Sequence, residues 1–179
     1  MAKPLLFLDI DGVLNPVLPS AEFTAYDILD HTVLLSAAHG AWLRELSAVY
    51  ELTWASTWEH EANRQIAPRL GLPVLPVVEF GRYRPRPGDP RLPRADLFTG
   101  RKWAPILRHA GGRPFAWIDD VIPRRLARQA RFRPDRVLLR INPGHGLNRG
   151  HVDRLLSRGP LPTRSVRLAR RESLTAHQF

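Results

Sequence analysis

Short runs of consecutive apolar residues alternate along the chain with segments in which apolar residues recur every three or four positions. The runs are typical of buried strands in a parallel sheet, and the spaced segments are typical of helices packed on such a sheet. The predicted strands are residues 5–8, 51–55, 74–78, 115–118 and 137–141. The predicted helices are residues 38–50, 59–70, 101–110, 124–130 and 148–156. This alternation predicts an α/β fold, a Rossmann-like doubly wound sheet of about five parallel strands with helices on both faces.

Four stretches depart from this regular alternation. Residues 20–35 alternate loosely between apolar and polar positions, which predicts a small hairpin flap after the first strand. Pro76 indicates that the strand at 74–78 is irregular or lies near a sheet edge. Residues 81–94 hold four prolines and five arginines and therefore predict a loop. From residue 159 the chain is basic, so we expect one domain at 1–158 and a tail at 159–179.

The composition is that of a globular protein with an excess of arginine. Of 179 residues, 44% are hydrophobic, and none is cysteine. The chain has neither a long apolar run nor a signal-peptide pattern, so we expect a cytoplasmic protein with no membrane partner. The net charge of +10 favours a nucleic-acid partner, yet only Lys3 and Lys102 among 27 cationic residues are lysines. Because that skew is also typical of biased codon composition, both explanations stay open.

Two carboxylates follow directly after the first apolar run. Asp9 and Asp11 stand where a parallel strand ends, which is the edge at which open parallel sheets bind ligands. Residues two apart on a strand share a face, so both side chains are expected to point at one site. Two anions this close need a cation or a proton to compensate their repulsion and lost hydration. The alternative is a helix-capping aspartate beside a turn aspartate.

Polar residues also stand at two later strand ends. Ser56 and Thr57 follow the second predicted strand, Asp119 and Asp120 follow the fourth, and Lys102 opens a helix between them. As alternatives, the hydroxyls and the acid pair would cap the helices that follow, and the lysine would be solvated.

The strand ends of a parallel sheet meet at one edge, so these groups are expected to converge. Clustered carboxylates would bind a hard cation through oxygen, and Mg²⁺ is the natural candidate. A hydroxyl and an ammonium beside that metal would hold a phosphate. This set of groups suits phosphoryl transfer to a carboxylate nucleophile.

The segment Asp9-x-Asp11-Gly12-Val13 resembles the first motif of the haloacid dehalogenase (HAD) superfamily in its phosphatase form, and the likeness extends over residues 4–156. The resemblance implies that Asp9 attacks phosphorus and forms an aspartyl-phosphate. It also implies that Asp11 protonates the leaving oxygen and then activates the water that hydrolyses the intermediate. An aspartate at this second position suits phosphate-ester hydrolysis, since it serves as acid and then as base.

The same resemblance assigns roles to the later polar residues. Ser56, or Thr57 beside it, would bond a phosphate oxygen, and Lys102 would balance the charge on the nucleophile and the phosphate. The implied Mg²⁺ ligands are Asp9, Asp11, Asp119 and Asp120.

The substrate is less defined than the chemistry. The gaps between the motifs leave no room for a separate cap domain, so we expect a capless member with an open site. An open site often accompanies large substrates such as proteins or nucleic-acid ends, although small phosphoesters remain if the hairpin and the arginine loop close it. His60, Arg82 and Arg84 are candidate substrate contacts, with solvated side chains as the alternative. The competing hypothesis is a nucleic-acid-binding module that uses the basic loop and tail.

Overall fold

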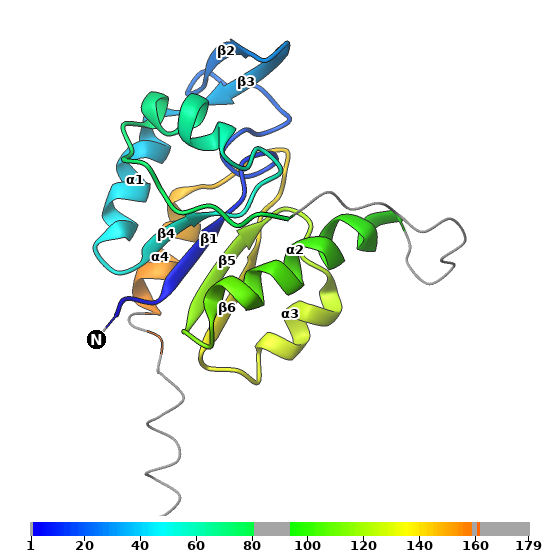
Figure 1. Ribbon diagram of the computed structural model, residues 1–179. Helices are drawn as coiled ribbons and strands as arrows, with labels where there is room; N and C mark the ends of the chain where they lie inside the picture. The colour runs from blue at the N-terminus through cyan, green and yellow to red at the C-terminus, as the bar shows by residue number, and fades with distance from the viewer. Residues whose placement is uncertain (1, 81–93, 159–160, 162–179) are drawn as a thin grey trace, which may run out of the picture.

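A parallel four-stranded sheet forms the centre of the protein (Figure 1). The computed structural model describes residues 2–80, 94–158 and 161. The strand order is β4-β1-β5-β6, with β4 at Glu51–Trp54, β1 at Leu5–Leu8, β5 at Phe115–Asp119 and β6 at Arg136–Arg140. Both neighbours of β1 run parallel to it, so the ends of β4, β1 and β5 meet at one edge of the sheet.

Helices cover both faces of the sheet, because side chains of β1 alternate between two hydrophobic clusters. Leu6 and Leu8 join the cluster that includes side chains of α1 (Ala37–Ser47) and α4 (Arg149–Ser157). Leu5 and Phe7 join the cluster beneath α2 (Arg94–Ala110) and α3 (Arg124–Ala130). Figure 1 shows these two helix pairs on opposite sides of the strands. The predicted α/β fold class is confirmed.

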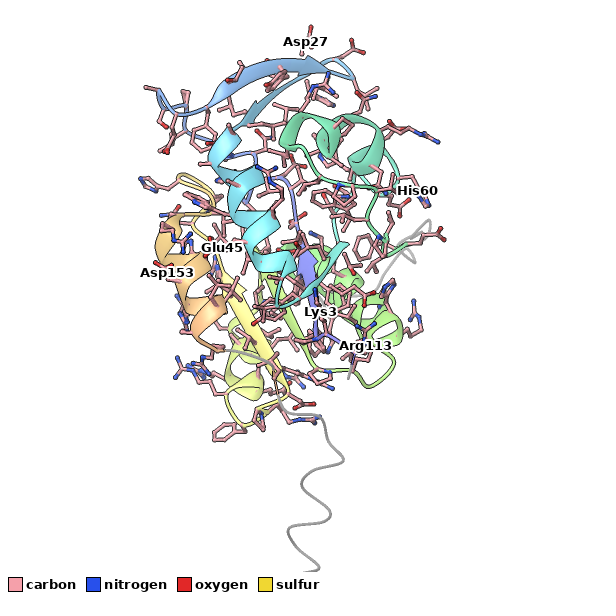
Figure 2. The ribbon with its side chains drawn as sticks, turned by 90° about the vertical axis from the view of Figure 1, so that its left-hand side faces the viewer. Lys3, Asp27, Glu45, His60, Arg113 and Asp153 are labelled. Carbon is pink, nitrogen blue, oxygen red and sulfur yellow. The ribbon has the colours of Figure 1, made fainter. Side chains whose placement is uncertain are left out.

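An ion-pair network on the surface joins α1 and α4, which cover the same face of the sheet. Arg149 of α4 donates to Glu45 of α1 at 3.0 Å and to Asp153 one turn further along α4 at 2.8 Å. Figure 2 shows Glu45 and Asp153 on these neighbouring helices. All three side chains are substantially exposed, so packing of the helices on the sheet contributes more to stability than this network.

The segment 74–78 does not form the predicted strand, because it makes a single bridge, between Trp54 and Val77, but the irregularity and edge position expected from Pro76 are confirmed. The Trp54 amide donates to Pro76 O, and the Val78 amide donates to Trp54 O, both at 2.8 Å. The next rung of a parallel ladder would need an amide hydrogen at position 76. Proline has none, so pairing with β4 stops there.

The single helix predicted at 59–70 is also wrong. A π-helical turn at Ala62–Ile66 is followed by a 3₁₀ turn at Pro68–Leu70. The Ala67 amide donates to Ala62 O, five residues back, and Pro68 cannot donate the bond that would continue an α-helix.

Helix α2 begins at Arg94, earlier than the predicted residue 101, so the end of the predicted loop is helical. Residues 81–93, with the candidates Arg82 and Arg84, lie outside the described residues. The tail at 159–179 also lies outside the described residues, except for Leu161, which packs in the larger core cluster. No helix in the described part of the chain has the length and apolar character needed to cross a membrane.

The predicted hairpin is confirmed as β2 (Thr24–Ile28) and β3 (His31–Leu35), an antiparallel pair. It lies beyond the end of β1, on the side of the sheet where the predicted site residues stand (Figure 1). The Asn15 side chain ties it to the loop after β1, because Asn15 Oδ1 accepts a hydrogen bond from the Leu34 amide at 2.8 Å. The hairpin is therefore attached to the segment that carries Asp9 and Asp11.

Replacement of Gly40 by alanine is expected to destabilise the fold. Helix α1 passes so close to Leu70 that a Cβ at Gly40 would lie 2.1 Å from the Leu70 carbonyl oxygen. Relieving that overlap requires a backbone shift, which we expect to cost about 1–3 kcal/mol in the free energy of unfolding, measured by chemical denaturation. The matched control is Gly150→Ala in α4, whose new Cβ approaches only the Asn148 side chain, at 3.4 Å. Equal losses in the two variants would contradict this explanation.

Candidate active site

A buried lysine lies between two buried aspartates at the end of the sheet. Asp9 follows β1 and Asp119 ends β5, and these strands are adjacent, with the Asp9 amide donating to Ile118 O at 3.1 Å. Lys102 of α2 places its Nζ 2.6 Å from Asp9 Oδ2 and 2.8 Å from Asp119 Oδ2. All three residues are less than a tenth exposed. The predicted convergence of these groups is therefore present in the structure.

Backbone amides hold the second oxygen of each carboxylate. Asp9 Oδ1 accepts from the Ile10 amide at 2.9 Å, and Asp119 Oδ1 accepts from the Val121 amide at 2.8 Å. Each carboxylate is thus held on both of its oxygens, one by an amide and one by the ammonium. This leaves little freedom for either side chain to rotate, so the site is preorganised.

The electrostatics of this cluster favour an additional positive charge. Burial, reinforced by the charge of Asp119, raises the pKa of Asp9 to about 7, although Lys102 opposes the shift. Burial alone would lower the pKa of Lys102, but the two carboxylates outweigh it and raise that pKa. Burial and the charge of Asp119 also raise the pKa of Asp120. One ammonium therefore does not fully compensate three carboxylates.

These three carboxylates could hold a metal ion together. Asp9, Asp119 and Asp120 each offer an oxygen atom, and the three atoms lie within 4.8 Å of one another. An all-oxygen donor set of this charge fits a hard divalent cation such as Mg²⁺. Gly12 makes room for Asp120: its φ is +72°, and a Cβ there would lie 2.7 Å from Asp120 Cγ. Any side chain at position 12 would displace the third carboxylate.

Asp11 lies beside this cluster, but its carboxylate is not part of it. Asp11 Oδ1 accepts from Asn15 Nδ2 at 3.0 Å, and Asp11 Oδ2 accepts from Trp58 Nε1 at 2.9 Å. The expected common face of Asp9 and Asp11 assumed that the strand continues to residue 11. Strand β1 ends at Leu8, and Ile10 O accepts three amide hydrogen bonds of a turn, so the side chains no longer alternate.

The remaining predicted residues fall into three groups. Ser56 is buried, and its Oγ accepts a long hydrogen bond of 3.5 Å from the Trp58 amide. Thr57 is exposed and lines the same cavity as Asp9. His60 is exposed on the outer side of the segment after β4 and pairs with Glu79 at 3.1 Å (Figure 2). Thr57 therefore lines this cavity, and His60 is not among its lining residues.

Two adjoining cavities open at this edge of the sheet. The catalytic cavity, about 300 Å³, is lined by Asp9, Asp11, Thr57, Lys102, Asp119 and Asp120. The hairpin cavity, about 560 Å³, is lined by Leu29, His31 and Val33 of the hairpin and by Thr57, Trp58 and Glu61. Asp11 and Thr57 line both, so they stand at the boundary between the two cavities.

Two residues that hold the Asp11 carboxylate are not evident from the sequence. Trp58 and Asn15 each donate to one oxygen of its carboxylate. Trp58 lies in a polar segment after a strand, and Asn15 lies in a turn with many equivalent roles for asparagine. Neither carries a sequence signal that distinguishes a site residue from a surface residue.

Comparison with known proteins gives a family and nothing closer. The family model described as the HAD domain in Swiss Army Knife RNA repair proteins matches residues 5–152, which include the whole cluster. No curated protein and no solved structure matches the chain. The match covers most of the chain, from β1 into α4. The chain therefore belongs to this family of HAD domains from RNA repair proteins.

Proposed function

We propose that this protein is a Mg²⁺-dependent phosphatase that removes terminal phosphates from nucleic acids through an aspartyl-phosphate on Asp9. One observation carries the proposal: a buried lysine holds Asp9 and Asp119 beside a third carboxylate, in a HAD domain of RNA repair proteins. Buried carboxylates that are not fully compensated destabilise the fold, and such groups are typical of functional sites. Phosphoryl transfer is a function that requires them.

The divalent cation would be held by Asp9, Asp119 and Asp120, whose oxygens are already close together. When bound, it would neutralise negative charge on the phosphate and on the carboxylates around it. Lys102 would add a second positive charge and favour the ionised, nucleophilic form of Asp9 against the effect of burial. Thr57, exposed in the catalytic cavity, and Ser56 beside it are the candidates for a hydroxyl that binds a phosphate oxygen.

The reaction would proceed in two steps. In the first, an oxygen of Asp9 attacks phosphorus, the bond from phosphorus to the leaving oxygen breaks, and Asp11 gives that oxygen a proton. In the second, Asp11 takes a proton from water, the water oxygen attacks phosphorus, and the bond to Asp9 breaks to release phosphate. The hydrogen bonds from Asn15 and Trp58 would orient the Asp11 carboxylate for both proton transfers.

Exposed arginines on α3 support a polyanionic substrate. Arg124, Arg125 and Arg128 of α3 and Arg131 at its C-cap are exposed, and their side chains form no ion pair among the residues that the structure describes. Helix α3 itself contains no acidic residue, and it begins shortly after Asp119 and Asp120. The N-terminal end of α3, at Arg124, is the end closer in sequence to Asp120 of the catalytic cavity, and cationic side chains there suit the phosphates of a nucleic acid. This charge also supports the second candidate function, a nucleic-acid-binding module without catalysis.

Replacement of Asp9 or Asp11 by asparagine is expected to lower phosphatase activity by a thousandfold or more, because each change removes a group that forms or breaks bonds. The measurement is phosphate release from a 3′- or 5′-phosphorylated oligonucleotide, with EDTA abolishing activity and excess Mg²⁺ restoring it. Asp153→Asn on the surface of α4 is the matched control and should keep full activity. Metal-dependent activity that survives both site variants would refute the proposed chemistry.

Replacement of Trp58 by phenylalanine is expected to lower kcat on the order of tenfold and to change KM by a smaller factor. The phenyl ring fills most of the same space but cannot donate to Asp11 Oδ2, so the acid loses one of its two orienting bonds. Steady-state kinetics on the same oligonucleotides measure both constants. Trp42→Phe on α1, away from the site, is the control, and a matching loss there would indicate a general effect on folding.

Loss of Arg124 and Arg128 is expected to weaken oligonucleotide binding and to flatten its salt dependence. For single strands, each lost phosphate contact makes the negative slope of log K against log salt shallower by about 0.7. The double alanine variant retains helix propensity, and Arg154 of α4 with Arg158 at the C-cap of that helix, also four residues apart and exposed, give a matched double control. Equal slopes for the two double variants would remove α3 from the binding surface.

A further inference from the structure

We propose that the hairpin cavity binds the leaving group of the reaction, and that this leaving group is the terminal nucleoside of the substrate. The inference rests on the proposed function and extends it from the phosphate to the group that carries the phosphate. It comes from the position of Asp11, from the walls of the cavity, and from an unusual residue in the turn of the hairpin.

The position of Asp11 decides which side of the site the leaving group occupies. The acid that protonates the leaving oxygen must contact that oxygen, so the rest of the leaving group extends beyond the acid. Asp9 and Lys102 line the catalytic cavity on one side of Asp11. On its other side lies the hairpin cavity, which shares Asp11 and Thr57 with the first. A phosphate next to Asp9 therefore directs its leaving group into the hairpin cavity.

The walls of this cavity suit a flat ring with polar edges. Trp58 and Leu29 offer apolar surface from two different segments, and the Trp58 ring is held by its hydrogen bond to Asp11. His31 and Glu61 add groups that can bond to ring nitrogens or ribose hydroxyls, and Arg64 pairs with Glu61. At about 560 Å³ the cavity falls in the usual range for ligand pockets. Stacking on aromatic side chains is a common way to hold a base.

The charges of the cavity exclude a second phosphate. Asp11 and Glu61 are among the residues that line it, whereas no lysine or arginine of the described chain does. A phosphodiester placed there would face two carboxylates: Glu61 is paired with Arg64, but Asp11 is bonded by the neutral Asn15 and Trp58 side chains, and this disfavours a second phosphate. The occupant is thus a nucleoside, with any further phosphate of the strand outside the cavity.

The turn of the hairpin provides independent support. Leu29 and Asp30 join β2 to β3 with φ of 51° and 62°, a two-residue turn whose positions favour Asn-Gly. A leucine with positive φ is uncommon and strained, and such strain persists mainly where a function needs it. Leu29 is 56% exposed and lines the cavity, so packing in the core does not explain it. An apolar contact to a bound ring does explain it.

Matched glycine substitutions in this turn distinguish a role of the Leu29 side chain from a role of the turn's backbone conformation. Leu29→Gly removes the side chain from the cavity wall, whereas Asp30→Gly relieves the same positive φ at a residue that does not line the cavity. The measured quantity is selectivity: kcat/KM on adenosine 3′- or 5′-monophosphate divided by kcat/KM on acetyl phosphate, which has a small leaving group. We expect Leu29→Gly to lower this ratio on the order of tenfold, with no loss of thermal stability. Asp30→Gly should not lower it.

Other outcomes overturn the inference. An equal fall of the ratio in both glycine variants would indicate a role for the hairpin backbone alone. A phosphoserine peptide that outperforms both nucleotides, and whose hydrolysis falls in Leu29→Gly, would assign the cavity to a peptide.

Failure of the proposed function would look different, because the wild-type protein would then hydrolyse neither acetyl phosphate nor nucleotide. In that case the affinity for the adenosine monophosphates, measured by calorimetry, still tests whether the hairpin cavity binds a nucleoside. Weaker binding to Leu29→Gly than to Asp30→Gly supports a nucleoside site, and equal or absent binding rejects it.

Discussion

The Lys102 ammonium between Asp9 and Asp119 is the interaction on which the rest of the site depends. It joins α2 to the ends of β1 and β5, three elements that meet only in the folded chain. Removing one partner of such a buried set leaves an uncompensated charge and costs about 3–5 kcal/mol. The same contact sets the chemistry, since burial favours the neutral form of Asp9 and the lysine favours the ionised form.

The sequence predicts the parts of this arrangement that follow from strand order alone. The runs at β1 and β5 are continuous and apolar, so their positions are evident, and parallel strands must end at a common edge. The convergence of Asp9, Asp119 and Lys102 follows from that geometry. The interruption at Pro76 beside β4 is evident from the sequence, whereas the break of the helix at Pro68 after the π-helical turn is not.

The less predictable half of the site depends on contacts between segments. Trp58 reaches Asp11 across a sequence distance of 47 residues, and no local pattern indicates that contact. The turn at Leu29 carries a residue that its backbone conformation disfavours, so propensity gives no hint of the actual φ. Asp11 lines the same cavity as Asp9, but its partners Asn15 and Trp58 do not follow from strand alternation, because the strand ends before it. Such features require the folded structure.

Asn15 has a consequence for how the hairpin and the acid move. One end of its amide donates to Asp11 Oδ1 and the other accepts from the Leu34 amide in β3. A displacement of the hairpin must therefore break one of these bonds or carry the amide with it, and in either case the acid loses or changes a partner. The amide thus acts as a mechanical linkage, through which the placement of the hairpin is transmitted to Asp11, the proposed proton donor.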